Sequence, residues 1–408
     1  MKINRLIYQV ILFAVVSVNL SAADWPKFLG PRGDGISEET SWNQNWQGKE
    51  PPVLWDADVG IGCASVTIAQ GRAYTVGQLA KGQDTIFCFD AVTGKKQWEF
   101  SYPQDLEPTY YSGGPSCAPT IDGGKLYTVS KVGDLICLDA VTGSLIWKKN
   151  YITDFGGEKQ MWGYAAAPLP VGDMIICEPG GTAGSSIVAL KKNTGEVAWK
   201  SGNDKAGYTT PVLFANDAHT GFVCFNEFGL VGHALTGGEL FRHPWKTQYG
   251  VNAANPLHKD GQFLISSDYG AGASLIKTTA EGVVSVVWKN EALLLQFQNM
   301  VLVGDHVYAV SGDNRTRADL KCVEFATGKV KWSERLRENR GNVLVAANKL
   351  LVLSESGELL LVEPDPSAFK PLGKVQANRK PCWAPPAFSN GLLYTRNNDG
   401  KLTCMDLR

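Results

Sequence analysis

A nine-residue segment recurs along the chain and constrains its fold more than any other feature. It consists of an acidic or polar residue, two further residues, Thr-Gly, three residues and an aromatic residue. Copies occupy positions 90–98, 139–147, 191–199, 233–241 and 324–332, with a looser copy at 278–288. Their aromatic ends lie 42 to 52 residues apart, a spacing that is typical of propeller blades and too long for leucine-rich or ankyrin repeats.

Each repeat unit contains four short segments with the composition of β-strands. In the second unit they read CAPTI, KLYTVSK, DLICLDA and SLIWKK, separated by Gly and Asp turns. No convincing helical period extends over about twelve residues or more, which disfavours bundles and alternating β-α folds. We therefore expect an all-β, eight-bladed β-propeller of four-stranded antiparallel blades. The eight units cover residues 63–100, 115–149, 162–200, 208–246, 250–290, 297–334, 341–373 and 382–408.

The last unit ends before its Thr-Gly turn and lacks a fourth strand. Residues 51–59 carry Trp55 without a preceding Thr-Gly. We predict that this N-terminal strand pairs with the C-terminal blade and closes the ring, which removes exposed strand edges. The predicted domains are a signal peptide at 1–23, an N-terminal segment at 24–62 with the closing strand, and a propeller at 63–408.

The repeat resembles the tryptophan-docking motif of quinoprotein alcohol dehydrogenases, which carry pyrroloquinoline quinone (PQQ) in an eight-bladed propeller. It is also similar to the non-enzymatic propeller lipoprotein of the outer-membrane assembly machinery. The resemblance covers nearly all of the chain after residue 23. It implies that one set of aromatic residues has a structural role and packs between blades. This set is Trp55, Trp98, Trp147, Trp199, Trp288 and Trp332.

The N-terminus has the pattern of a secretory signal peptide: Lys2 and Arg5, an apolar run, and small residues up to Ala23. We expect cleavage after Ala23 and a periplasmic or secreted protein with no transmembrane segment in the mature chain. The 39 basic and 40 acidic residues nearly cancel, which argues against a nucleic-acid partner. Nine cysteines without CxxC spacing predict no metal site and favour packing roles. We expect a monomer.

Connections from each outer strand to the next inner strand line one mouth of a propeller channel, where we expect a ligand. These connections are rich in aromatic and amide side chains. The alternative is that the aromatics plug the channel and the amides cap strand ends. The candidate ligand-binding residues are Trp162, Tyr164, Tyr208, Tyr249, Asn252, Asn255, Gln298, Asn299, Asn342 and Trp383.

Two functions follow from these observations. The first is a non-catalytic binding or scaffold module for a protein, peptide or carbohydrate partner at a ring face or in the channel. The second, implied by the resemblance, is a PQQ-dependent alcohol or sugar dehydrogenase that uses calcium. Those enzymes have adjacent cysteines and acidic calcium ligands, whereas this chain has no Cys-Cys pair and only Glu178 and Asp268 as suggestive acids. We assign no catalytic residue, and the first function is favoured.

Overall fold

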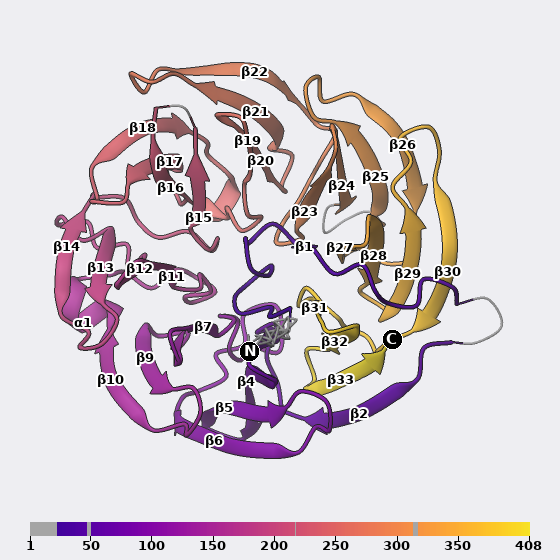
Figure 1. The fold of residues 1–408 in the computed structure, drawn as a ribbon. Coiled ribbons are helices and arrows are strands. Elements are labelled where there is room, and N and C mark those ends of the chain that lie inside the picture. The colour runs from indigo at the N-terminus through magenta and orange to yellow at the C-terminus, as the bar shows by residue number, and fades with distance from the viewer. Residues whose placement is uncertain (1–22, 47–49, 217, 313–316) are drawn as a thin grey trace, which may run out of the picture.

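The computed structural model describes residues 23–46, 50–216, 218–312 and 317–408. Eight β-sheets are arranged around a central axis (Figure 1). Seven sheets have four strands, and one has an additional short strand. The fold is therefore the predicted all-β, eight-bladed propeller.

The strands run antiparallel within each blade, from the innermost to the outermost. Blades 1 to 4 contain β3 (Thr67–Ala69), β4 (Arg72–Ala80), β5 (Gln83–Asp90) and β6 (Lys96–Pro103); β7 (Thr120–Asp122), β8 (Lys125–Val129), β9 (Asp134–Asp139) and β10 (Leu145–Asn150); β11 (Leu169–Val171), β12 (Met174–Cys177), β13 (Ile187–Lys191) and β14 (Val197–Ser201); and β15 (Val212–Ala215), β16 (Thr220–Phe225), β17 (Gly229–Ala234) and β18 (Glu239–Pro244). Blades 5 to 8 contain β19 (Leu257–Lys259), β20 (Gln262–Ser267), β21 (Gly272–Thr278) and β22 (Val284–Asn290); β23 (Met300–Val303), β24 (His306–Ser311), β25 (Asp319–Glu324) and β26 (Val330–Arg335); β27 (Gly341–Ala346), β28 (Lys349–Ser354), β29 (Glu358–Glu363) and β30 (Lys370–Gln376); and β31 (Ala387–Ser389), β32 (Leu392–Arg396), β33 (Lys401–Asp406) and β2 (Val53–Asp58).

The ring closes as predicted, because the outer strand of blade 8 comes from the N-terminal part of the chain. β2 pairs antiparallel with β33, and Trp55 lies opposite Cys404. The buried guanidinium of Arg396 also joins blade 8 to the start of blade 1, since it donates to the carbonyl oxygens of Gly60 and Ala64. Both ends of the chain therefore contribute to one closed ring.

Indole rings pack at the seams between neighbouring blades. Trp98 Nε1 in blade 1 donates to the carbonyl oxygen of Ala140 in blade 2 at 3.2 Å, and its ring lies against Gly143 of the next Thr-Gly turn. Trp55, Trp147, Trp288 and Trp332 make the equivalent hydrogen bond. Trp199 instead stacks on Phe222 at 6.4 Å. The repeated aromatic residue thus lies where one blade meets the next.

The acidic residue of the repeat stabilises its own turn. Asp90 Oδ1 accepts hydrogen bonds from the backbone and hydroxyl groups of Thr93, which hold the pKa of Asp90 below its usual value. In blade 4, His233 takes this position; it is 2% exposed and stacks on Phe222 at 5.2 Å. The repeated segment is therefore a structural unit.

The N-terminal segment 24–46 covers one mouth of the channel. This mouth lies on the face that carries the Thr-Gly turns, which we call the lower face. Figure 1 shows this segment crossing the centre of the ring. Trp25 pairs with Ile68 of blade 1, and β1 (Ile36–Ser37) pairs in parallel with β27 of blade 7. Trp46 packs beside Gly373 of blade 7. The sequence did not predict this closure.

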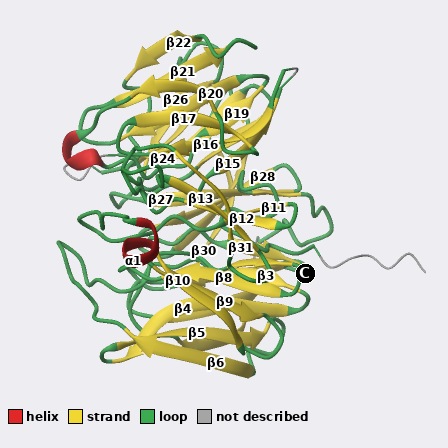
Figure 2. Cartoon of the chain, turned by 90° about the vertical axis from the view of Figure 1, so that its left-hand side faces the viewer, coloured by secondary structure: helices red, strands yellow, loops and turns green. Residues whose placement is uncertain are grey.

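The opposite face, which lies on the left in Figure 2 and which we call the upper face, carries the connections from outer to inner strands, including the short helix α1 (Tyr151–Phe155). The Asn150 side chain caps this helix, and Gly156 ends it with a φ of 67°. In the described part of the chain, no helix has the length and apolar character required to cross a membrane. All nine cysteines are free, and eight are buried. The predicted signal peptide lies outside the described residues except for Ala23.

Candidate functional site

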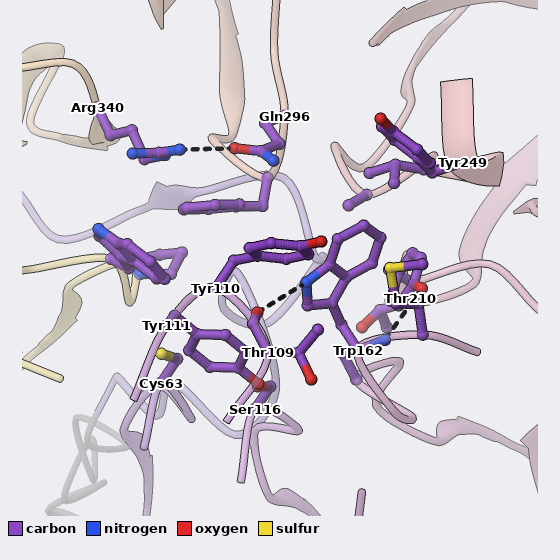
Figure 3. Close-up of a pocket in the computed structure, with 18 of the residues that line it drawn as sticks. Cys63, Thr109, Tyr110, Tyr111, Ser116, Trp162, Thr210, Tyr249, Gln296 and Arg340 are labelled. Atoms are coloured by element: carbon purple, nitrogen blue, oxygen red, sulfur yellow. Dashed lines mark hydrogen bonds between the residues drawn. The ribbon is translucent and has the colours of Figure 1, made fainter. Parts of the chain in front are cut away.

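A pocket of about 470 Å³ occupies the upper mouth of the channel (Figure 3). Each of the eight connections from an outer to an inner strand contributes at least one lining residue. Nine lining side chains are aromatic: Phe28, Tyr110, Tyr111, Trp162, Tyr208, Tyr249, Tyr269, Phe297 and Trp383. The ring architecture therefore gathers aromatic side chains from distant parts of the sequence at one place.

The aromatic rings on the blade 3 to 5 side meet edge to face. Trp162 lies 6.1 Å from Tyr208 and 6.5 Å from Tyr249, with interplanar angles of 64° and 80°. Tyr249 makes a similar contact with Tyr269 at 5.8 Å. Trp162 Nε1 donates to the carbonyl oxygen of Thr109 at 3.2 Å and fixes the indole across two loops. Such edge-to-face pairs add to the stability of the wall.

The opposite wall holds a guanidinium between aromatic rings. Arg340 lies 5.2 Å from the ring centres of both Phe297 and Trp383 and donates to Gln296 Oε1 at 2.9 Å. Glu355 lies behind this wall, where it accepts from Trp383 Nε1 at 2.9 Å and approaches Arg340 at 3.9 Å. Burial lowers the pKa of Arg340. Arg340 is the only charged side chain among the described residues that line the pocket.

The floor of the pocket includes Phe28 of the N-terminal segment. This segment crosses the centre of the ring on the face opposite the pocket mouth (Figure 1). Tyr208 lies in the pocket wall, and burial raises the pKa of Tyr208 to about 12, so its hydroxyl stays protonated at neutral pH. The pocket is thus lined mostly by apolar and aromatic side chains, with a few polar groups among them.

The structure separates the predicted aromatic candidates. Trp162, Tyr208, Tyr249 and Trp383 line the pocket. Tyr164 does not, because it is 2% exposed and its hydroxyl donates to the carbonyl oxygen of Pro179 at 3.0 Å.

The five predicted amides lie outside the pocket and bond to the protein itself. Asn299 Nδ2 donates to the carbonyl oxygen of Val343 in the next blade, and Asn299 Oδ1 accepts from the Val343 N–H. Asn342 and Asn255 also join neighbouring blades. Asn252 bonds to two nearby backbone carbonyls, and Gln298 accepts two N–H groups in its own loop.

Several lining residues were not among the sequence candidates. They are Phe28, Tyr110, Tyr111, Tyr269, Phe297 and Arg340. Tyr110, Tyr111, Phe297 and Arg340 lie in the connections that were expected to line the mouth, so their position in the repeat was the available signal. Phe28 and Tyr269 lie outside those connections, and no repeat feature indicated them.

The pocket does not match the chemistry of PQQ with calcium. PQQ carries three carboxylates, and calcium requires several oxygen ligands. The lining residues that the structure describes offer one guanidinium and no carboxylate. In the same part of the chain, no group of three or more His, Cys, Asp or Glu could hold a metal ion. The residues present therefore do not fit this group.

The sequence profile of the PQQ-like family described as outer membrane protein assembly factor BamB matches residues 82–334 and 227–408. These two matches overlap and together span most of the chain. The chain belongs to this family. Membership agrees with the resemblance inferred from the Thr-Gly repeats.

Solved structures with the same fold come from different functional classes. BamB from Moraxella catarrhalis is 14% identical, with a TM-score of 0.61 over 87% of this chain and 99% of that one. Quinohemoprotein alcohol dehydrogenase from Comamonas testosteroni is 13% identical, with a TM-score of 0.66 over 94% and 80%. The computationally designed Ika8 protein is 11% identical, with a TM-score of 0.59 over 91% and 99%. No curated protein sequence matches the chain. At these identities the structural similarity shows the fold alone.

Proposed function

We propose that this BamB-family propeller is exported, non-catalytic, and binds a segment of a partner protein in the pocket on its upper face. The composition of the pocket carries this proposal. Tyr, Trp, Phe, Met and Arg line it, and Asp, Glu and Lys are missing from its described lining. The same residue types are enriched at the centres of protein interfaces, and the same charged types are depleted there.

The rim of the pocket supports a protein partner over a fully enclosed small molecule. Tyr110, Met161 and Tyr249 are 94%, 54% and 59% exposed and all line the pocket. Apolar side chains gathered at a pocket entrance mark interaction sites. With a volume of about 470 Å³, the pocket accommodates a few apolar side chains of the partner, and the backbone of the partner stays on the rim.

The remaining parts of the proposal come from the sequence and from the family. The signal-peptide pattern at 1–23 supports export to the periplasm or beyond, as a monomer. The family description of an assembly factor agrees with a role in holding another protein. A carbohydrate partner and a PQQ-dependent dehydrogenase are the alternatives that the experiment must separate.

Selection of displayed random peptides against residues 24–408 tests the proposal. We expect peptides that contain aromatic residues and bind with micromolar Kd. Met161→Asp places a carboxylate at the rim, and a bound peptide would bury this charge without a partner. The variant should therefore bind the peptide at least about tenfold more weakly. Val92→Asp is the matched control, since Val92 is 49% exposed in a Thr-Gly turn of the lower face.

Three outcomes would contradict the proposal. They are equal binding by the Met161→Asp and Val92→Asp variants, retention of an oligosaccharide from a glycan array with no peptide selected, and stoichiometric retention of PQQ with calcium after gel filtration.

A further inference from the structure

Three tyrosines of the pocket have left-handed backbone conformations. The φ angles of Tyr110, Tyr249 and Tyr269 are 64°, 65° and 60°, and all three line the pocket. Bulky L-residues rarely adopt this conformation because Cβ approaches the backbone too closely. Strained residues of this kind persist where a site requires them.

Turns between the first and second strands of several blades have the same backbone conformation on the lower face. Asp260-Gly261 and Asn390-Gly391 are consecutive left-handed pairs in strand turns, and Asn or Asp before Gly is the favoured choice for such a pair. Tyr249-Gly250 and Tyr269-Gly270 are also left-handed pairs. In two other strand turns of the lower face, Gln70 and Ala347 take the first left-handed position. None of these four lower-face turns has an aromatic residue there, whereas a tyrosine takes the position at the pocket.

Contacts within the protein do not fully offset the backbone strain of a tyrosine in the left-handed conformation. Tyr110 is 94% exposed and Tyr249 is 59% exposed, so both rings leave most of their apolar surface in water. Tyr249 makes ring contacts with two other pocket aromatics, Trp162 and Tyr269. A ligand that covers these rings would bury the surface that the free protein leaves exposed.

We propose that Tyr110, Tyr249 and Tyr269 are the ligand-contact residues that determine the specificity of the pocket. Their left-handed backbone lowers the stability of the protein, and their rings surround an apolar side chain of the ligand. This inference rests on the proposed function, because it assigns the contact residues of the same pocket. The ligand group that they recognise is an aromatic or large aliphatic side chain of the docked protein segment.

Substitution of these tyrosines by asparagine separates their contribution to ligand binding from their contribution to the stability of the fold. Tyr249→Asn and Tyr269→Asn relieve backbone strain but remove edge-to-face contacts, and Tyr269→Asn also removes the hydrogen bond that the Tyr269 hydroxyl accepts from Gln296 at 2.7 Å. We therefore expect a loss of Tm clearly smaller than that caused by removing a fully buried tyrosine. Binding of the neutral fluorescent probe N-phenyl-1-naphthylamine, measured by titration, should weaken at least fivefold in each variant. Tyr110→Asn should behave in the same way.

Two controls calibrate these variants. Tyr164→Asn removes a buried tyrosine with a hydrogen bond to Pro179, and it should lower Tm without a specific effect on the probe. Asn390→Tyr introduces a tyrosine into a left-handed position of the lower face, and it should lower Tm and leave probe binding unchanged.

The inference is overturned if the Tyr249 and Tyr269 variants lose as much Tm as Tyr164→Asn, or if they bind the probe like the unmodified protein. Failure of the peptide selection alone has a different meaning. If no peptide is selected but the asparagine variants lose the probe with a smaller loss of Tm than Tyr164→Asn, the protein partner is wrong and the contact assignment stands.

Discussion

At the scale of single residues, the glycine of each Thr-Gly turn provides the surface on which the indole of the preceding blade rests. A Cβ at Gly143 would lie 2.7 Å from Trp98 Cδ2, whereas a Cβ at Gly123 would meet nothing within 4 Å. Both glycines have positive φ angles, 74° and 54°. The pair therefore separates backbone strain from loss of indole packing.

Gly123→Ala should lower the free energy of unfolding by about 1–2 kcal/mol through backbone strain alone. Gly143→Ala should lower it by a further 1–3 kcal/mol or so, because the indole of Trp98 must shift. Urea unfolding of both variants measures the difference. Equal losses would show that the indole does not need the glycine surface.

Glu178 predicts a pH dependence of stability. Burial raises the pKa of its carboxyl to about 8, a nearby Asp204 adds to this shift, and the Gly207 N–H opposes it. Because the folded state holds the proton more tightly than the unfolded state, stability falls as pH rises from about 4.5 to 8, by roughly 1 kcal/mol per pH unit. Glu178→Gln should remove this slope and stabilise the protein at pH 8 but not at pH 4. Parallel slopes for both proteins in urea titrations would contradict this.

The sequence predicted pocket aromatics better than pocket amides, for a physical reason. Trp162 and Tyr208 have apolar rings that can line a channel mouth without finding a partner for every polar atom, and both line the pocket, although Tyr164 is buried. An amide such as Asn299 matches the unpaired backbone groups of the next blade and is used there. Residue type alone does not distinguish these two uses.

At the scale of elements, the N-terminal part of the chain is bound to the first and the last blades. The Glu39 carboxylate accepts the N–H groups of Asn390 and Gly391 at 2.8 Å in blade 8, and the Trp42 ring meets Phe388 at 5.6 Å. The missing outer strand of the last repeat made β2 predictable. Residues 24–46 follow no repeat and contact turns of several blades, so their path could not be predicted.

Deletion of residues 24–58 should remove the outer strand of blade 8 and the floor of the pocket together. We expect a large decrease in Tm and a broadened calorimetric transition, because an exposed strand edge and buried apolar surface are left uncovered. A synthetic peptide of residues 24–58, added in trans, should restore part of the lost Tm. An unchanged, cooperative transition in the deleted protein would refute the closure role.

At the scale of the whole molecule, ring closure depends on one buried cation in addition to β2. Arg396 is 1% exposed and donates to Gly60, Ala64 and the Thr75 hydroxyl. Arg396→Met removes the donor to these buried acceptors, of which the Ala64 carbonyl keeps the Thr75 hydroxyl as a partner, so the free energy of unfolding should fall by about 3–5 kcal/mol. Arg396→Lys keeps the charge but not the planar guanidinium. Its free energy of unfolding should lie between those of the unmodified protein and the Arg396→Met variant. A loss below about 1 kcal/mol in Arg396→Met, measured by urea unfolding, would contradict this role.

The family and the eight-bladed ring were predictable because the repeat fixes both. The pocket was not predictable in detail, because its residues come from eight connections and from Phe28 in a segment outside the repeats. Function in this ring therefore depends on where the copies differ.

Hydrogen exchange with and without a selected peptide tests the binding of a protein segment in the upper pocket most directly. We predict protection of the connections 104–116, 156–165, 245–256 and 291–299 when the peptide is bound, and unchanged exchange in the Thr-Gly turns of the lower face. Protection of the outer strands or of the lower face, with unchanged exchange in these connections, would contradict the account.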